Sequence, residues 1–148
     1  MAYALDGLRV LDLSRVLAGP WATQLLGDLG AEIIKIEHPV RGDDTRSWGP
    51  PFQFGEDGDT REASYFLSAN RNKKSVCVDI STEAGQSVIR ELSASSDVLV
   101  ENFKTGTLEK YGLDAASLRL INPRLIYCSI TGFGHTGPYA DQPGYDLL

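Results

Sequence analysis

The stretch Leu8-Arg9-Val10-Leu11-Asp12-Leu13 decides the fold, together with the helix and the strand that come directly after it in the chain. It has the length and apolar content of a strand, and Ala18-Gly19-Pro20 interrupts that pattern. Apolar residues then recur with helical spacing from residue 21 to residue 29, and Gly30 is a typical helix stop. A second strand, residues 33–37 (IIKIE), begins three residues later. Strand, helix and strand within about 30 residues predict a right-handed βαβ crossover and hence a parallel sheet.

The rest of the chain repeats this alternation. Strands are predicted at residues 75–80, 97–101 and 125–130, with apolar helical faces before the last two. Residues 38–62 show almost no periodicity and predict a long loop, a feature that is usually functional or faces a partner. A short helical turn is expected around residues 64–67. The predicted fold class is α/β, a Rossmann-like open parallel sheet with flanking helices.

Composition limits the classes of function. The chain has 148 residues, 42% of them hydrophobic, and a net charge of −6, as expected for one soluble globular domain. The acidic balance argues against a nucleic-acid or anionic-membrane partner. With neither a long apolar run nor a leader pattern, the expected location is cytoplasmic. Cys77 and Cys128 lie in strand-like runs without CxxC spacing and are predicted to be buried free thiols.

The topology predicts where a ligand would bind. In an open parallel sheet, the site lies outside the carboxyl ends of the strands, where helix N-termini converge. The segments at the ends of the five predicted strands are residues 14–18, 37–38, 78–81, 101–104 and 131–133.

Several well-known motifs for ligand-binding and catalytic sites are absent from the sequence. Glu37 ends the second strand as a dinucleotide-binding acid would, but the turn at residues 14–20 lacks GxGxxG, which disfavours NAD or FAD. No P-loop, GxSxG or metal-ligand spacing occurs. The two histidines, His38 and His135, are interpreted as exposed loop imidazoles, with a ligand role left open for His38.

Two polar clusters remain. Residues 70–74 (NRNKK) precede the third strand, which places them at the amino edge and favours a solvated or interface role over phosphate binding. Residues 102–104 (Asn-Phe-Lys) come after a strand at the carboxyl edge, where they could bind, stack against and neutralise a nucleotide. A core role for Phe103 is equally open. Asp12 and Asp97 are interpreted as structural.

A series of sequence blocks, in this order, carries a family resemblance: residues 5–20, 29–37, 42–46 (GDDTR), 70–75 (NRNKKS), 100–103 (VENF), 130–134 (ITGFG) and 137–139 (GPY). The chain resembles the class III CoA-transferases, the carnitine and bile-acid-inducible (CaiB/BaiF) family. The resemblance implies transfer of CoA from an acyl-CoA to a carboxylic acid through an aspartyl anhydride and an aspartyl-CoA thioester. CoA would act as substrate, with no metal and no covalently bound cofactor.

Family members are much longer and form interlocked homodimers. The resemblance therefore implies that residues 1–148 are the N-terminal part of a large CoA-binding α/β domain and that the chain is truncated. It also places the nucleophilic aspartate beyond Leu148, so no catalytic residue is expected in this segment.

The resemblance implies CoA-binding roles for Val16, Leu17, Ala18, His38, Val78, Asp79, Ile80, Ser81, Asn102, Phe103, Lys104, Lys110, Gly144, Tyr145 and Asp146. Residues 16–18 and 144–146 would border the thioester, residues 78–81 the adenine, and residues 102–104 the pantetheine and nucleotide. His38 and Lys110 stand where relatives often have arginine. Lysine keeps the charge there but loses the bidentate geometry.

Two alternatives stay open. The α-methylacyl-CoA racemase branch has a histidine where this chain has Tyr145, and a phenol with a reference pKa near 10 is a poor base near neutrality. Transferase is therefore favoured over racemase. The other alternative is a non-catalytic CoA-binding fragment. Residues 43–52 resemble members that act on dicarboxylates such as succinate and glutarate, but the acceptor acid stays undecided.

Overall fold

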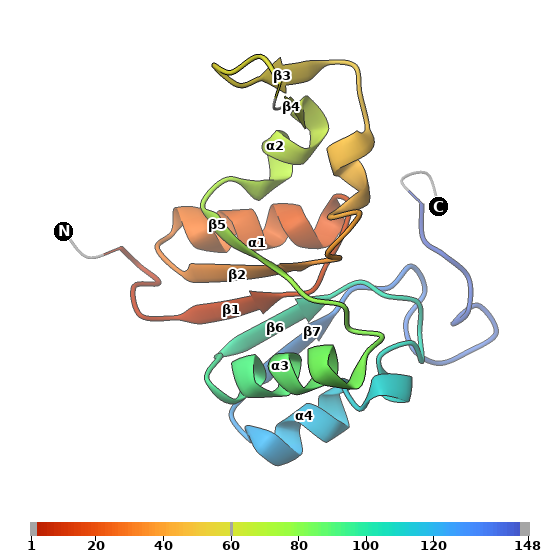
Figure 1. Cartoon of the computed structure of the whole chain (residues 1–148). Coiled ribbons are helices and arrows are strands. Elements are labelled where there is room, and N and C mark those ends of the chain that lie inside the picture. Colours follow the sequence, from red (N-terminus) through yellow and green to blue (C-terminus); the bar gives the residue numbers. More distant parts are fainter. Residues whose placement is uncertain (1–2, 60, 146–148) are drawn as a thin grey trace.

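The protein is a parallel α/β domain, described by a computed structural model over residues 3–59 and 61–145 (Figure 1). In this part of the chain, five strands form one sheet in the order β5-β2-β1-β6-β7, and β3 and β4 form a separate hairpin. The elements are β1 (Arg9–Asp12), α1 (Ala18–Asp28), β2 (Glu32–Glu37), the 3-10 turn η1 (Asp44–Ser47), β3 (Phe52–Phe54), β4 (Arg61–Ala63), α2 (Ser64–Asn70), β5 (Lys73–Cys77), α3 (Glu83–Ala94), β6 (Val98–Glu101), the 3-10 turn η2 (Glu109–Tyr111), α4 (Ala115–Ile121) and β7 (Ile126–Ser129).

The predicted parallel sheet is confirmed. Each neighbouring pair of its strands is parallel, with β1 in the centre between β2 and β6. Helix α1 covers one face of the sheet, and α3 and α4 cover the other (Figure 1). All five carboxyl ends therefore lie along one edge, and the segment after β7 turns back beside that edge (Figure 1).

The two faces have separate apolar cores, because successive side chains of a strand point to opposite sides. Leu11 of β1 and Leu99 of β6 belong to the larger core, beneath α3 and α4. Val10 and Val100, their neighbours in sequence, belong to the smaller core on the α1 side. This alternation buries both faces of the central strands, as is typical of parallel sheets.

The buried face of α1 differs from the predicted one. Pro20 lies in the first turn and Gly30, at φ +105°, comes after the helix, as predicted. However, Trp21, Leu25 and Leu29 are each about half exposed, and the helix instead buries Gly19, Pro20, Thr23 and Gln24. The reason is that this face carries the partners of buried polar groups. Thr23 donates to Asp12 at the end of β1, and Gln24 donates to the Ser68 carbonyl oxygen and accepts from the N–H of Arg71.

The segment at residues 38–62 is more regular than predicted. It contains η1 and the antiparallel hairpin of β3 and β4, which projects away from the sheet (Figure 1). Each of these strands has three residues, too few to show a period of two. The predicted turn at residues 64–67 is confirmed as part of α2, and β5 begins two residues earlier than predicted.

The predicted burial is wrong for the two cysteines and only partly right for residues 70–74. Cys77 and Cys128 are exposed rather than buried, because they lie on β5 and β7, the two edges of the sheet. The cluster at residues 70–74 is not uniformly solvated, since Asn70 is buried and the Lys73 side chain is 2% exposed. Its other cations, Arg71 and Lys74, pair at the surface with Asp28 and Glu32.

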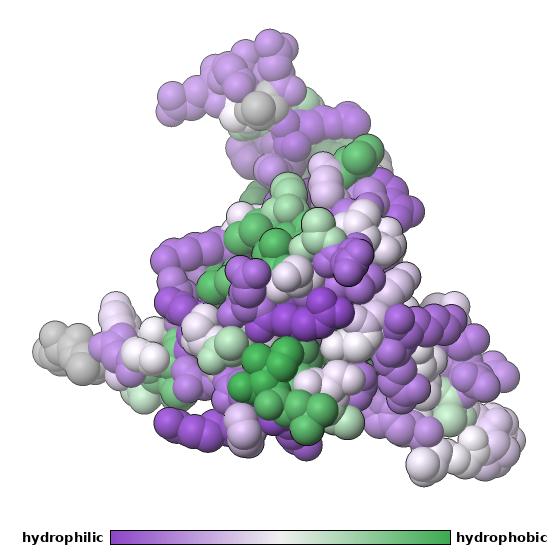
Figure 2. Space-filling view, turned by 60° about the horizontal axis from the view of Figure 1, so that its bottom comes forward, coloured by the Kyte–Doolittle hydropathy of each residue, from purple (hydrophilic) through white to green (hydrophobic). Residues whose placement is uncertain are grey.

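The surface combines separate apolar patches with polar areas, and the hairpin end is largely hydrophilic (Figure 2). Exposed apolar residues include Trp21 and Leu25 of α1, Leu120 of α4 and Ile126 of β7. Among the residues that the structure describes, no helix is long and apolar enough to cross a membrane.

We predict that Leu99→Ala lowers the free energy of unfolding by about 3 kcal/mol, because Leu99 is fully buried in the larger core and its removal leaves a cavity. The matched control is Leu120→Ala, since the Leu120 side chain is 87% exposed. Urea denaturation measures both, and equal losses in the two variants would contradict this assignment of the core.

Candidate functional site

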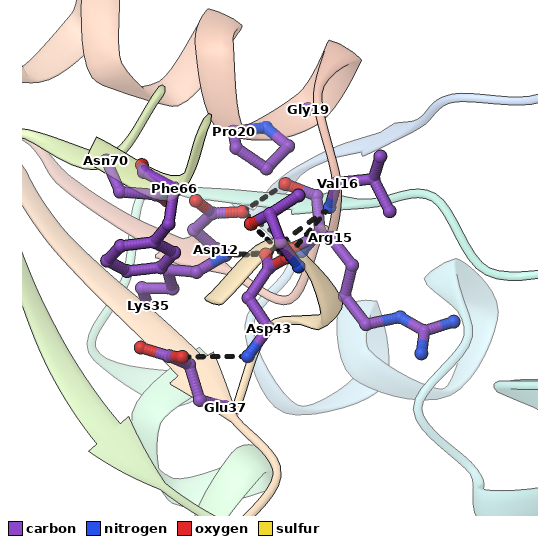
Figure 3. Close-up of polar contacts among 12 residues, drawn as sticks. Asp12, Arg15, Val16, Gly19, Pro20, Lys35, Glu37, Asp43, Phe66 and Asn70 are labelled. Atoms are coloured by element: carbon purple, nitrogen blue, oxygen red, sulfur yellow. Dashed lines mark hydrogen bonds and ion pairs between the residues drawn. The ribbon is translucent and has the colours of Figure 1, made fainter. Parts of the chain in front are cut away.

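A buried cluster of charges lies where β1 ends (Figure 3). Asp12 accepts hydrogen bonds from Lys73 Nζ at 3.0 Å, from Thr23 Oγ1 at 2.6 Å and from the N–H of Ser14 at 3.0 Å. Lys35 Nζ donates to Asp43 and to the carbonyl oxygen of Ser14, both at 2.9 Å. The side chains of both ion pairs are at most 2% exposed. Buried charges are tolerated only when paired in this way, so the structural reading of Asp12 is confirmed.

Asp43 joins this cluster to the end of β2. Its Oδ1 accepts from the N–H and the hydroxyl of Thr45, and its own N–H donates to Glu37 at 2.9 Å. Burial would by itself raise the pKa of Asp43, but the charge of Lys35 and these hydrogen bonds hold it below its usual value. The Asp43 carboxylate therefore stays ionised as a fixed part of the framework.

Glu37 is also fully committed. Arg46 binds it in a bidentate manner at 2.6 and 2.8 Å, and the Ser75 hydroxyl donates to it at 2.6 Å. Burial opposes ionisation, but Arg46, Ser75 and the N–H of Asp43 together lower the pKa of Glu37 to about 2. With both oxygens occupied, Glu37 cannot serve as the ribose-binding acid of a dinucleotide site. This finding agrees with the missing glycine fingerprint.

The loop at residues 14–18 is held from two sides in an unusual conformation. Val16 has φ +70°, a region that β-branched residues rarely adopt. Asp43 accepts from the N–H of Val16 at 3.3 Å. From the end of β6, Asn102 accepts from the N–H of Arg15 at 2.8 Å and donates to its carbonyl oxygen at 2.7 Å. The Asn102 amide, which the sequence predicts to face a ligand, thus fixes the backbone of the loop.

Two adjoining cavities at the carboxyl edge gather most of the predicted site. The smaller, about 230 Å³, is lined by His38, residues 78–81 and Phe103, together with Arg15 and Arg41. The larger, about 610 Å³, is lined by Ala18, residues 102–105, residues 130–132 and residues 140–145. Phe103 lines both. The topological prediction of a site outside the carboxyl ends is thus matched by cavities at that edge.

Of the two roles left open for Phe103, the structure shows the core contact. Its ring is partly buried against the larger core, and the Arg15 guanidinium carbon lies 5.0 Å from the ring centroid. This cation–π distance is within the usual range. Phe103 therefore anchors the wall between the two cavities.

The segment that closes the larger cavity depends on two glycines. A Cβ on Gly132 would lie 2.5 Å from the Cα of Gly144, so only glycine lets the two backbones cross so closely. This crossing brings Gly144 and Tyr145 to the cavity wall, and Tyr145 is 71% exposed there.

Four other positions that the resemblance assigns to CoA binding are not seen to line either of these two cavities. Val16 and Leu17 line neither cavity, although their neighbours Arg15 and Ala18 do. Lys110 is exposed on η2 and lines neither cavity, and Asp146 lies outside the described residues. In the described part of the chain, no three His, Cys, Asp or Glu residues could together hold a metal ion.

A third cavity, about 530 Å³, shares Phe103 and Lys104 with the predicted site. It lies between the ends of β6 and β7 and the start of α4, and it is lined by Glu101, Lys104, Tyr127 and His135, among others. Burial, with the nearby charge of Glu101, raises the pKa of Tyr127 well above its usual value. Tyr127 carried no signal in the sequence, whereas Glu101 ends a predicted strand and His135 was interpreted as an exposed loop imidazole.

The fold and the position of these cavities define an open parallel-sheet α/β protein with cavities at the carboxyl edge of its sheet. The chain belongs to CoA-transferase family III, whose family model matches residues 5–148. It is 56% identical, over 97% of its length, to a succinate–glutarate CoA-transferase of Agrobacterium fabrum. It is 54% identical to the human succinyl-CoA:glutarate CoA-transferase, again over 97% of its length.

Solved structures agree with this assignment. A CaiB/BaiF family protein from Brucella suis superposes on 99% of the chain with a TM-score of 0.93 at 58% identity. The chain covers 36% of the Agrobacterium protein, 32% of the human protein and 38% of the Brucella chain. It therefore spans about a third of the length of these relatives.

We predict that acid destabilises the protein partly through Glu37. Because its folded pKa of about 2 lies below the ordinary value of 4.5, its contribution is complete above about pH 4.5 and is lost as the pH falls toward 2. At neutral pH, this shift corresponds to about 3 kcal/mol. Glu37→Gln should lower the unfolding free energy at pH 7 and flatten its slope below pH 4.5, measured by denaturant titration. Glu56→Gln, at an exposed site, is the control, and an unchanged acid slope in Glu37→Gln would refute the assignment.

We predict that Asn102→Asp destabilises the protein by about 1–2 kcal/mol. The substitution removes the donor to the Arg15 carbonyl and places a carboxylate oxygen beside that carbonyl. Gln142→Glu makes the same amide-to-acid change at an exposed position and should leave the thermal midpoint unchanged. If both variants melt together with the parent protein, Asn102 does not hold the loop.

Proposed function

We propose that the chain forms the CoA-binding part of a CoA-transferase that moves CoA from an acyl-CoA to a dicarboxylic acid. The observation that carries this proposal is the pair of adjoining cavities in a family III chain, which gathers His38, residues 78–81, residues 102–104 and residues 144–145 at one edge. CoA is a long ligand with a charged nucleotide at one end and a thioester at the other. Two cavities that meet at an aromatic ring suit that shape.

The proposed reaction proceeds through an enzyme carboxylate. An aspartate carboxylate attacks the thioester carbonyl, the C–S bond breaks, and the CoA thiolate leaves with a mixed anhydride formed. The thiolate then attacks the aspartyl carbonyl and releases the donor acid, which gives an aspartyl-CoA thioester. The acceptor carboxylate next attacks this thioester, the thiolate leaves again, and its attack on the acceptor carbonyl completes the new acyl-CoA and restores the aspartate. This nucleophile is proposed to lie outside residues 1–148.

The residues of this chain bind and orient the substrate. Ala18, Gly144 and Tyr145 border the larger cavity, where the thioester end is proposed to lie, and Lys104 supplies a cation at the same wall. The clamped loop at residues 14–18 keeps that wall in one geometry, which favours reaction by reducing the freedom of the bound thioester. The donor and acceptor are proposed to be succinyl-CoA and glutarate, because the Agrobacterium and human relatives carry those names.

The assembly proposed for the whole protein is an interlocked homodimer in which residues 1–148 form the N-terminal part of the large domain. This proposal is supported by the match to about a third of each relative and by the half-exposed apolar residues of α1.

We predict that the full natural protein that contains these 148 residues converts succinyl-CoA and glutarate into glutaryl-CoA and succinate. The reaction should proceed without ATP and should not respond to EDTA, because the carboxylate relay needs neither a nucleotide nor a metal ion. Chromatography with mass detection measures the new thioester.

Two results would contradict this function. Loss of activity in EDTA would point to metal chemistry, and deuterium uptake at the α-carbon of a branched acyl-CoA would point to the racemase branch. CoA binding without transfer to any of a panel of dicarboxylates would favour the non-catalytic alternative.

A further inference from the structure

We propose that Arg15 and Arg41 form the phosphate-binding pair of the smaller cavity and hold the nucleotide end of CoA there. Neither residue belongs to the positions carried over from the family resemblance. The inference rests on the proposed function, because it assumes that CoA is the ligand.

Arg15 has its backbone and its side chain in separate roles. Asn102 fixes both polar groups of its backbone. The side chain points away from the buried charge cluster (Figure 3) and reaches the Phe103 ring at the cavity wall. Its ion pair with Asp44 is long, at 3.5 Å, and both side chains are 45% exposed. Exposed pairs of this kind contribute little, so the guanidinium is free to exchange Asp44 for a phosphate.

Arg41 is brought to the same cavity by a tight turn after β2. The N–H of Gly42 donates to the His38 carbonyl oxygen at 2.8 Å, and Gly42 adopts φ +65° to close the turn. The His38 ring accepts at Nδ1 from the N–H groups of Val40 and Arg41, at 3.1 and 3.3 Å. One ring nitrogen of His38 is therefore used to hold the turn. The Arg41 side chain lines the cavity beside it.

These contacts divide the work at this turn between two residues. His38 organises the backbone, and Arg41 supplies a planar guanidinium that can bind phosphate in a bidentate manner. An imidazole lacks this geometry.

Two carboxylates also line this cavity. Glu37 is paired with Arg46. Asp79 accepts from the N–H and the hydroxyl of Ser81 at 3.0 and 2.6 Å, and its charge also interacts with Arg41. Outside the Glu37–Arg46 pair, the smaller cavity thus has two arginines, Arg15 and Arg41, against the one carboxylate of Asp79. The described lining of the larger cavity has one cation, Lys104, and one carboxylate, Asp141, and much of its wall is apolar. A ligand with several phosphates at one end is therefore expected to place that end against Arg15 and Arg41, with its thioester end in the larger cavity.

The experiment compares three probes by calorimetry: CoA, adenosine 3′,5′-bisphosphate, which is its nucleotide end, and pantetheine, which is its other end. The variants are Arg15→Gln and Arg41→Gln, with Arg124→Gln as the control, because Arg124 precedes β7 at the opposite edge of the sheet. Each site variant should weaken binding of CoA and of the bisphosphate by about tenfold or more. Binding of pantetheine should not change, and Arg124→Gln should match the parent protein for all three probes.

The outcomes separate this inference from the proposed function. If the parent protein binds none of the three probes, the proposed function fails and this inference fails with it. If the parent binds CoA but both site variants retain its affinity, or lose pantetheine equally, only the arginine assignment is overturned. Arg15→Lys and Arg41→Lys keep the charge, and partial recovery of bisphosphate binding in them would separate lost contact from lost folding.

Discussion

The buried pairing of Asp12 with Lys73 and of Lys35 with Asp43 is the constraint on which the rest of the structure depends. These four charges lie between the sheet and α1, so each needs a partner of opposite sign. The Asp12–Lys73 pair links β1 to β5, and the Lys35–Asp43 pair links β2 to the loop that follows it. This pairing also explains why α1 buries Thr23 and small residues against the sheet while its large apolar side chains stay half exposed.

The same pairing shapes the candidate site. Asp43 accepts a hydrogen bond from the N–H of Val16 in the loop after β1. Asn102, at the end of β6, donates to the carbonyl oxygen of the neighbouring residue, Arg15. Two segments, one after β2 and one after β6, thus hold residues 14–18 in one position. Val16 has a positive φ, which is a strained conformation for valine, and the contacts with Asp43 and Asn102 hold it there. A rigid first loop gives both cavities a defined common wall.

The residues that the resemblance carried over divide into two kinds in the structure. His38, residues 78–81 and Phe103 line the smaller cavity, and Ala18, Lys104 and Gly144 line the larger. Asn102 lines the larger cavity and also fixes the backbone of Arg15, whereas Val16 lines neither cavity and belongs to the backbone framework beside them. A residue that the resemblance assigns to the CoA site can therefore act by fixing the backbone next to it. Only the hydrogen-bond geometry reveals that role.

The sequence by itself determined the alternation of strands and helices, the parallel sheet, the edge at which a ligand would bind and the family resemblance. These features depend on short-range periodicity and on turn residues, which are local properties of the sequence. Only the tertiary structure decided that Lys73 is buried, that Cys77 and Cys128 are exposed, and that Arg15 and Arg41 meet at one cavity. Those outcomes depend on which strands lie at the edges of the sheet and on which charges face each other across it. Such contacts join residues far apart in sequence, and no local pattern records them.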